Sequence, residues 1–146
     1  MASPDPPELP AWGPGTVTVL STGAGPPHAI PVSTALRTGP RTVVLALALR
    51  RESLARLRED PRCALTVLAA GTVAVTAHGR ATVVEEPLGA SEGVAALRID
   101  VDAVQDHGQP TFEIDDAVRW HWTDDDAAAR DAAIRAALIA LGDAPV

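Results

Sequence analysis

The stretch LALALRRESLARLREDPRC, residues 45–63, changes from a strand pattern to a helix pattern. Its first five residues form an uninterrupted apolar run, which is typical of a buried strand. In RESLARLRED (51–60), Leu54 and Leu57 lie three residues apart among charged residues, which predicts a short amphipathic helix. Pro61 ends it, because proline disfavours a helical residue before it. We therefore expect a strand, a basic turn and a short helix in immediate succession.

The turn into this helix gathers basic and hydroxyl side chains near the positive end of the helix. They are Arg50, Arg51, Ser53 and Arg56. Free backbone N–H groups, the helix dipole, a hydroxyl and guanidinium groups together suit a phosphate monoester. A solvated basic helix face accounts for the same residues equally well, so the pattern alone leaves both interpretations open.

The residues before this stretch have the composition of strands. Apolar and β-branched residues fill 16–22, 27–36 and 41–49, and glycine and proline separate the runs. We expect three antiparallel strands in a meander. Residues 1–15 contain five prolines and two glycines, which predicts an extended arm with Trp12 as a point of attachment to the domain.

The residues after it continue the β pattern. Strands are expected at 63–70, at 72–86 with a bend at His78-Gly79, at 94–105 and, as the last strand, at 118–123. In 94–105 the alternation puts Leu97, Ile99, Val101 and Ala103 on the buried face. Residues 86–93 and 106–117 are expected to be loops, the first with at most one helical turn.

A C-terminal helix is the most regular element of the sequence. Residues 127–141 carry Ile134, Leu138 and Leu141 on one stripe, Thr123 with Asp126 resembles a capping box, and Gly142 is expected to end the helix. This order of elements predicts a mainly-β (α+β) fold, an antiparallel split β-barrel with short helices and a C-terminal helix, in which the helices plug the ends of the barrel. We expect one domain, 16–146, behind the arm.

Composition excludes several classes of function. The chain of 146 residues has a net charge of −7, which opposes a nucleic-acid partner. No apolar stretch is long enough to span a membrane and no signal peptide is visible, so a cytoplasmic protein is expected. The single cysteine, Cys63, lies in an apolar run and fits a buried core residue in a reducing compartment. The chain contains no lysine, which excludes Schiff-base chemistry.

Motifs for other catalytic chemistry are missing. We find no Gly-x-Ser-x-Gly elbow, no Walker loop and no Gly-x-Gly-x-x-Gly turn, and the four histidines have no metal-binding spacing. His28 and His78 fit structural roles in strands, although His28 precedes a strand that also qualifies for a ligand contact. His107 follows Asp106 in a loop, a pair that would provide a proton donor, although an exposed Asp-His contact without a catalytic role is the commoner arrangement.

A set of short motifs gives the chain a resemblance to a known family. They are Gly25, Pro27, Pro31 and Val32, then Asp60, Pro61 and Arg62, then Gly79 and Ala81. In this order the sequence resembles the pyridoxamine-phosphate-oxidase-like, FMN-binding split β-barrels, most closely over residues 16–86. The resemblance implies a flavin ring along 29–34, a phosphate at 50–56, and a homodimer whose partner subunit completes the site.

Carried over by position, the resemblance names the candidate cofactor-binding residues. They are Pro31, Val32, Ser33, Thr34, Arg50, Arg51, Ser53, Arg56, Gln109 and Trp120, with Trp122 as a further candidate. The two tryptophans fit core or interface packing as well. The implied function is a flavin-dependent oxidoreductase that acts on a small molecule and needs no catalytic side chain, because the cofactor supplies the chemistry.

Two departures from the family keep other cofactors open. Glu52-Ser53 stands where the family has a basic pair, so a deazaflavin, a haem, or a non-catalytic dimeric module with a decayed phosphate site are the alternatives. The strand VAVTAHG (73–79) is mostly apolar where the oxidases proper carry polar residues, so oxidation of vitamin B6 is not the expected reaction.

Overall fold

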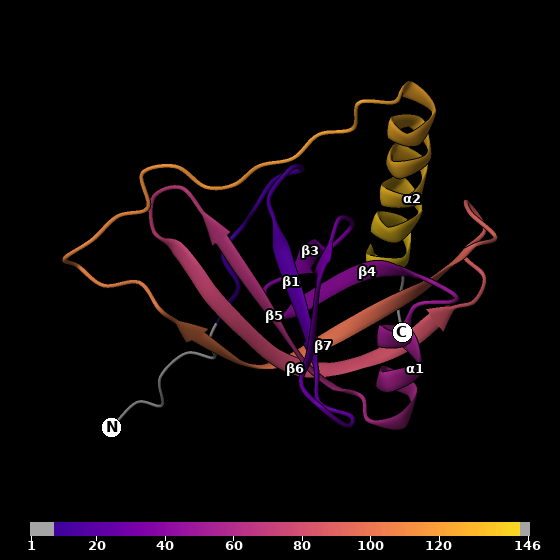
Figure 1. Cartoon of the computed structure of the whole chain (residues 1–146), viewed down its shortest axis with the longest axis horizontal. Helices are drawn as coiled ribbons and strands as arrows, with labels where there is room; N and C mark the ends of the chain where they lie inside the picture. The colour runs from indigo at the N-terminus through magenta and orange to yellow at the C-terminus, as the bar shows by residue number, and fades with distance from the viewer. Residues whose placement is uncertain (1–7, 144–146) are drawn as a thin grey trace.

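The computed structural model describes residues 8–143, in which seven strands form one antiparallel curled sheet, a half-barrel. The strands follow the order β2-β1-β5-β6-β7-β4-β3. The elements are β1 Thr18–Thr22, β2 His28–Val32, β3 Leu36–Gly39, β4 Thr42–Ala48, α1 Glu52–Glu59, β5 Arg62–Ala69, β6 Val73–Glu85, β7 Val94–Asp106 and α2 Asp125–Asp143. The predicted mainly-β split barrel is confirmed (Figure 1).

The long strands β6 and β7 bend together at Gly79, as the sequence predicts. The pairing register shifts between His78 and Gly79. A Cβ on Gly79 would lie 2.3 Å from the carbonyl oxygen of Asp100, so only glycine fits at this approach. The shift leaves Asp102 as an extra residue in β7, which changes the alternation beyond it. The prediction that Ala103 faces the core is therefore wrong, because Ala103 is exposed.

The N-terminal strands do not form the predicted three-stranded meander. Residues 27–36 are divided between β2 and β3; β2 pairs with β1, whereas β3 pairs with β4 and β4 pairs with β7. The break has a local cause at Thr34, whose hydroxyl accepts a hydrogen bond from the N–H of Ala46 at 3.1 Å and donates to its carbonyl at 3.3 Å. A side chain thus replaces strand pairing at this point.

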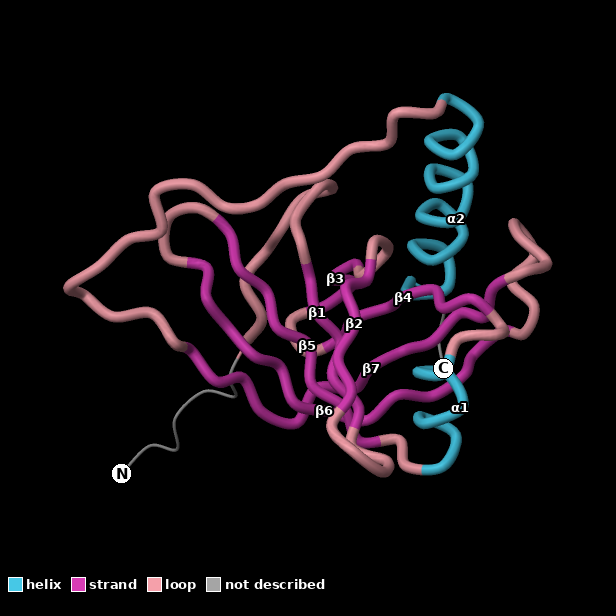
Figure 2. Tube along the Cα trace, in the orientation of Figure 1, coloured by secondary structure: helices cyan, strands magenta, loops and turns pink. Residues whose placement is uncertain are grey.

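Residues 118–123 do not form the predicted last strand. Val118 is 77% exposed, and within the described chain the segment has a single bridge, between Thr16 and Arg119. An alternating side-chain pattern forms a strand only where a partner strand satisfies the backbone hydrogen bonds. This segment has such a partner at a single residue. Instead it belongs to a long loop that runs from the end of β7 to the start of α2 (Figure 2).

Both predicted helices are present. In α1, Arg51 is the N-cap and Asp60 the C-cap, and Leu54 and Leu57 are buried as predicted. The start of α2 differs from the prediction, because its cap is Asp124, whose carboxylate accepts from the N–H of Ala127 at 3.0 Å, rather than Thr123 with Asp126. The helix also continues one residue past Gly142.

The stripe of α2 covers a face of the sheet rather than an end of the barrel, which corrects the predicted placement. Ile134 and Leu138 pack with Val44, Leu88 and Ala96 in an outer cluster. A larger inner cluster fills the curl of the sheet. Cys63 belongs to that inner cluster, and burial raises the pKa of its thiol to about 12.

The described part of the N-terminal arm is attached along β3. The N–H of Leu9 donates to the carbonyl of Pro40 at 2.7 Å, and Arg37 donates from Nε to the carbonyl of Leu9 at 3.0 Å. The indole N–H of Trp12 donates to the carbonyl of Ala35 at 3.0 Å. The rest of the expected arm, residues 1–7, lies outside the described residues. Across residues 8–143, neither helix is long and apolar enough to cross a membrane.

Candidate functional site

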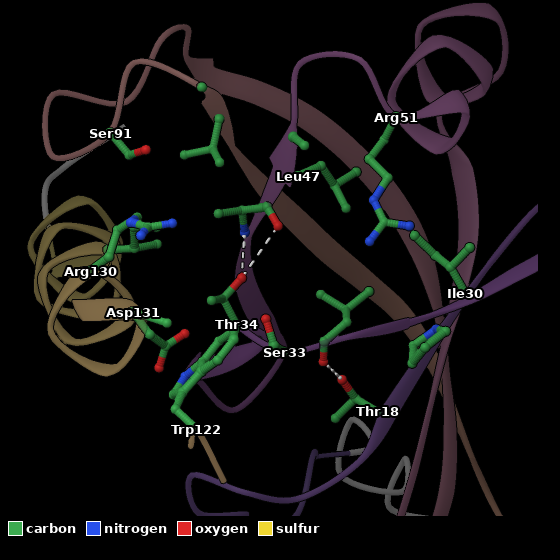
Figure 3. Close-up of a pocket in the computed structure, with 18 of the residues that line it drawn as sticks. Thr18, Ile30, Ser33, Thr34, Leu47, Arg51, Ser91, Trp122, Arg130 and Asp131 are labelled. Carbon is green, nitrogen blue, oxygen red and sulfur yellow. Dashed lines mark hydrogen bonds between the residues drawn. The ribbon is translucent and has the colours of Figure 1, made fainter. Parts of the chain in front are cut away.

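An open cleft of about 650 Å³ lies where the end of β2, the end of β4 and α2 meet. Residues 30–34 and 46–48 form its floor, the turn 91–94 closes one side, and segments between 120 and 134 provide the outer wall. Figure 3 shows Arg51 reaching in from the start of α1, with Arg130 and Asp131 of α2 on the opposite side. The break between β2 and β3 makes room for this cleft.

More than half of the predicted site residues line this cleft. They are Pro31, Val32, Ser33, Thr34, Arg51 and Trp120, together with Trp122. The floor is fixed by hydrogen bonds, because the hydroxyl of Thr18 donates to the carbonyl of Val32 at 2.8 Å and Thr34 is bound to Ala46. The residues at the end of β2 therefore present a preorganised surface.

Of the basic residues predicted to bind phosphate, Arg51 is the one that lines the cleft. It is the N-cap of α1 and makes no side-chain capping hydrogen bond. Its guanidinium points into the cavity (Figure 3) and, within residues 8–143, forms no ion pair. An exposed cation beside the start of a helix is placed to receive an anion.

Ser53 and Arg56 lie outside the cleft lining and bind the hairpin between β1 and β2. Ser53 is fully buried, and its hydroxyl is 3.0 Å from Nε2 of His28. Arg56 donates to two carbonyls of the hairpin turn, of which that of Pro26 lies at 2.6 Å. It also forms an ion pair with Glu52 at 3.1 Å. Their positions attach α1 to the sheet, and His28 has the structural role expected for it.

Arg50 and Gln109 are exposed and do not line the cleft. The predicted partnership of His107 with Asp106 is not formed, because Nε2 of His107 lies 2.9 Å from the hydroxyl of Thr76. Asp106 instead accepts from the N–H of Gly108 at 2.8 Å. The loop therefore turns the imidazole toward β6 rather than toward its neighbouring carboxylate.

Sequence reasoning missed the wall that α2 contributes. Ala127, Arg130, Asp131 and Ile134 all line the cleft. Their spacing puts them on one helical face, a signal that the sequence does contain. The apolar stripe of Ile134, Leu138 and Leu141 on this helix predicts packing against the sheet and does not by itself indicate a cleft.

Two aromatic rings complete the wall beside α2. The rings of Trp120 and Trp122 are edge to face, with centroids 5.2 Å apart and an angle of 84°. The guanidinium of Arg135 lies 6.0 Å from the ring centre of Trp120 and also donates to the carbonyl of Ser33. These contacts join the loop, the helix and the floor of the cleft.

A curled antiparallel half-barrel with an open cleft at its strand ends and a flanking helix is a split β-barrel. Residues 11–114 match the family described as pyridoxamine 5'-phosphate oxidase, and the chain belongs to this family. No curated protein sequence matches the chain.

Solved structures share the fold at low sequence identity. One described as an F420 reductase has a TM-score of 0.55 at 12% identity and covers 64% of this chain and 91% of its own. An FAD-binding protein of Mesorhizobium loti has a TM-score of 0.50 at 15% identity, covering 61% and 83%. A heme binding protein of Mycobacterium smegmatis has a TM-score of 0.55 at 20% identity, covering 68% and 52%.

Proposed function

We propose that the chain binds a flavin-type cofactor, FMN in the first instance, in the cleft and acts with it as an oxidoreductase on a small molecule. The observation that carries this proposal is Arg51, an exposed guanidinium at the N-cap of α1 that points into a cleft floored by residues 30–34. Membership of the family supports the same site.

The donor set of the cleft fits such a cofactor. Arg51 and the start of α1 would hold the phosphate by charge-assisted hydrogen bonds. The apolar floor, with Ile30, Val32 and Leu47, would hold the ring, and the exposed hydroxyl of Ser33 would face a polar edge. When bound, a flavin supplies hydride or electron transfer, and the side chains of this protein bind and orient it.

The lining of the cleft supports a flavin rather than haem as the proposed cofactor. Its described lining residues include no His, Cys, Met or Tyr, the side chains that ligate haem iron. Solved structures of the same fold are described as an F420 reductase, an FAD-binding protein and a heme binding protein. The lining therefore favours a flavin or a deazaflavin over haem in this chain.

A second candidate is a non-catalytic ligand-binding module of the same fold. The observation in its favour is that Ser53 and Arg56 are bound to the hairpin, which leaves Arg51 as the predicted phosphate ligand that lines the cleft. Glu52 adds a negative charge to the first helical turn. A weakened phosphate site would suit a ligand held without turnover.

The test begins with an absorbance spectrum of the purified protein, followed by titration with FMN, deazaflavin and haem while fluorescence and melting temperature are recorded. Arg51→Glu is compared with Arg50→Glu, because Arg50 is the exposed neighbour outside the cleft lining. We expect saturable FMN binding that Arg51→Glu weakens by about a hundredfold or more and Arg50→Glu changes little.

The outcomes separate the candidates. Binding of deazaflavin alone, with the same dependence on Arg51, replaces FMN but keeps the oxidoreductase. Binding without reduction by any pyridine-nucleotide donor supports the non-catalytic module. If neither flavin nor deazaflavin binds, the proposed function is wrong.

A further inference from the structure

The wall that α2 gives to the cleft carries a second cation. Arg130 belongs to the lining, and Figure 3 shows its guanidinium directed at the cavity from the side opposite Arg51. It is exposed, and no ion pair found among residues 8–143 includes it. A phosphate held at Arg51 would leave this second guanidinium unused.

The other charges of this wall are already balanced. Asp131, only 9% exposed, pairs with Nε of Arg135 at 2.7 Å. Arg135 also donates to the carbonyl of Ser33, so its guanidinium is held against the floor. The pair neutralises itself, whereas no ion pair within residues 8–143 includes Arg130, and Asp126 lies one helical turn before it.

The cleft that Arg130 faces is lined mostly by apolar groups. Ala127 and Ile134 lie on the same helix face as Arg130, and Val94 and Trp122 also line the cleft. A planar guanidinium matches a carboxylate with two parallel hydrogen bonds. An apolar wall beside one such fork therefore suits an organic acid with an apolar body and a single negative charge.

We propose that Arg130 determines the substrate class of the cleft, which is a small organic acid whose carboxylate pairs with Arg130 and whose apolar body packs on Trp122 and Ile134. The proposal rests on the proposed function, because the acid is the substrate presented to the bound flavin. Arg130 lies beyond residues 11–114, the part matched to the family. Substrate recognition is thus supplied by a segment outside the part of the chain that defines the family.

The experiment compares benzoate, phenylacetate and hexanoate, each beside its neutral primary amide. Full-length protein is titrated, with and without saturating FMN, and binding is followed by tryptophan fluorescence, since Trp120 and Trp122 line the cleft. We expect at least one acid to bind about tenfold or more tightly than its amide, and Arg130→Gln to bring the two to within about twofold.

Arg80→Gln is the matched control, because Arg80 is an exposed arginine of β6 that does not line the cleft. It keeps the preference for the acid. Arg130→Gln is also expected to bind FMN as the wild type does, which keeps the two proposals apart. If the wild type binds neither FMN nor deazaflavin, the proposed function is overturned, whereas the preference for acid over amide in the presence of saturating FMN tests Arg130. Equal binding of acids and amides, no saturable binding of either, or a preference that survives Arg130→Gln overturns the inference.

Discussion

Single residues fix the shape of the cleft, because their polar groups are hydrogen-bonded to other groups of the protein. The hydroxyl of Thr34 is bound to both backbone groups of Ala46, and the carbonyl of Ser33 accepts from Arg135. A ligand that enters the cleft then requires little rearrangement of the cleft floor. Arg51 and Arg130 contrast with these residues, because their guanidinium groups face the cavity.

Asp60 provides a pH prediction at this scale. Its side-chain hydrogen bonds with Arg62, at 2.7 Å for the closest pair, lower the pKa of the carboxyl from 3.8 to about 2. A depressed pKa in the folded state means that the contribution of Asp60 to stability is complete above pH 3.8 and is lost as the pH falls through about 2.

An NMR titration of the Asp60 carboxyl measures this directly. Arg62→Gln should raise the midpoint toward 3.8, because it removes the hydrogen bonds that favour the carboxylate. Arg58→Gln is the control, since Arg58 pairs with Glu86 instead. A midpoint near the ordinary value in the wild type would contradict the assigned ion pair.

Gly79 gives a prediction on stability. In Gly79→Ala, the new Cβ would stand 2.3 Å from the carbonyl oxygen of Asp100, so the paired strands β6 and β7 have to separate. We expect the free energy of unfolding to fall by about 2 kcal/mol or more. Urea unfolding is the measurement. Gly93→Ala, where a Cβ meets nothing within 4 Å, should stay near the wild type, and an equal loss in both variants would exclude this explanation.

The sequence located one half of the cleft. The basic turn into a helix makes Arg51 a candidate from local pattern, whereas the run 31–34 follows only from the family resemblance. The place of Arg130 and Asp131 in the cleft could not be predicted. The sequence shows that they share a helical face, but the surface that this face meets depends on the path of a long loop. Ser53 and Arg56 were assigned to the phosphate because local charge does not reveal a competing partner 25 or more residues away.

Among the elements, α2 connects stability to the cleft. One side of the helix packs into the outer cluster through Ile134 and Leu138, and Arg130 and Asp131 line the cavity from the same helix. Packing of the helix on β4 therefore positions the wall of the cleft.

Leu138→Ala should destabilise the protein strongly. Leu138 is fully buried in the outer cluster, and removal of its side chain leaves a cavity that costs about 3 kcal/mol. Ile139→Ala is the neighbouring control, because Ile139 is 49% exposed. Denaturant midpoints of the two variants give the comparison; similar losses would mean that α2 does not pack as described.

Elements that rest on local pattern were predicted well, whereas those that rest on distant partners were not. The helix 52–59 and the bend at Gly79 follow from leucine spacing and from a glycine in a long strand. The division of 27–36 into two strands depends on Ala46, and residues 118–123 lack a strand partner although their side chains alternate. Pairing over such separations leaves no local trace in the sequence.

For the whole molecule, we propose a homodimer, as the family resemblance implies. Large apolar side chains remain exposed on the described chain, and burial of some of them against a second copy would stabilise a dimer. They include Leu68, Phe112, Val118, Trp122 and Ile139. Light scattering after size-exclusion chromatography should give twice the chain mass of 15.1 kDa. A single chain mass at every concentration tested would contradict the dimer.

The arm also has a consequence for how separate molecules meet. β3 is the terminal strand of the sheet, and an open sheet edge invites strands from other molecules. Leu9 and Trp12 bind the carbonyls of Pro40 and Ala35, at the two ends of β3. The arm thus covers this edge and hinders strand pairing between molecules. A chain that begins after Trp12 would leave the edge open and would tend to aggregate.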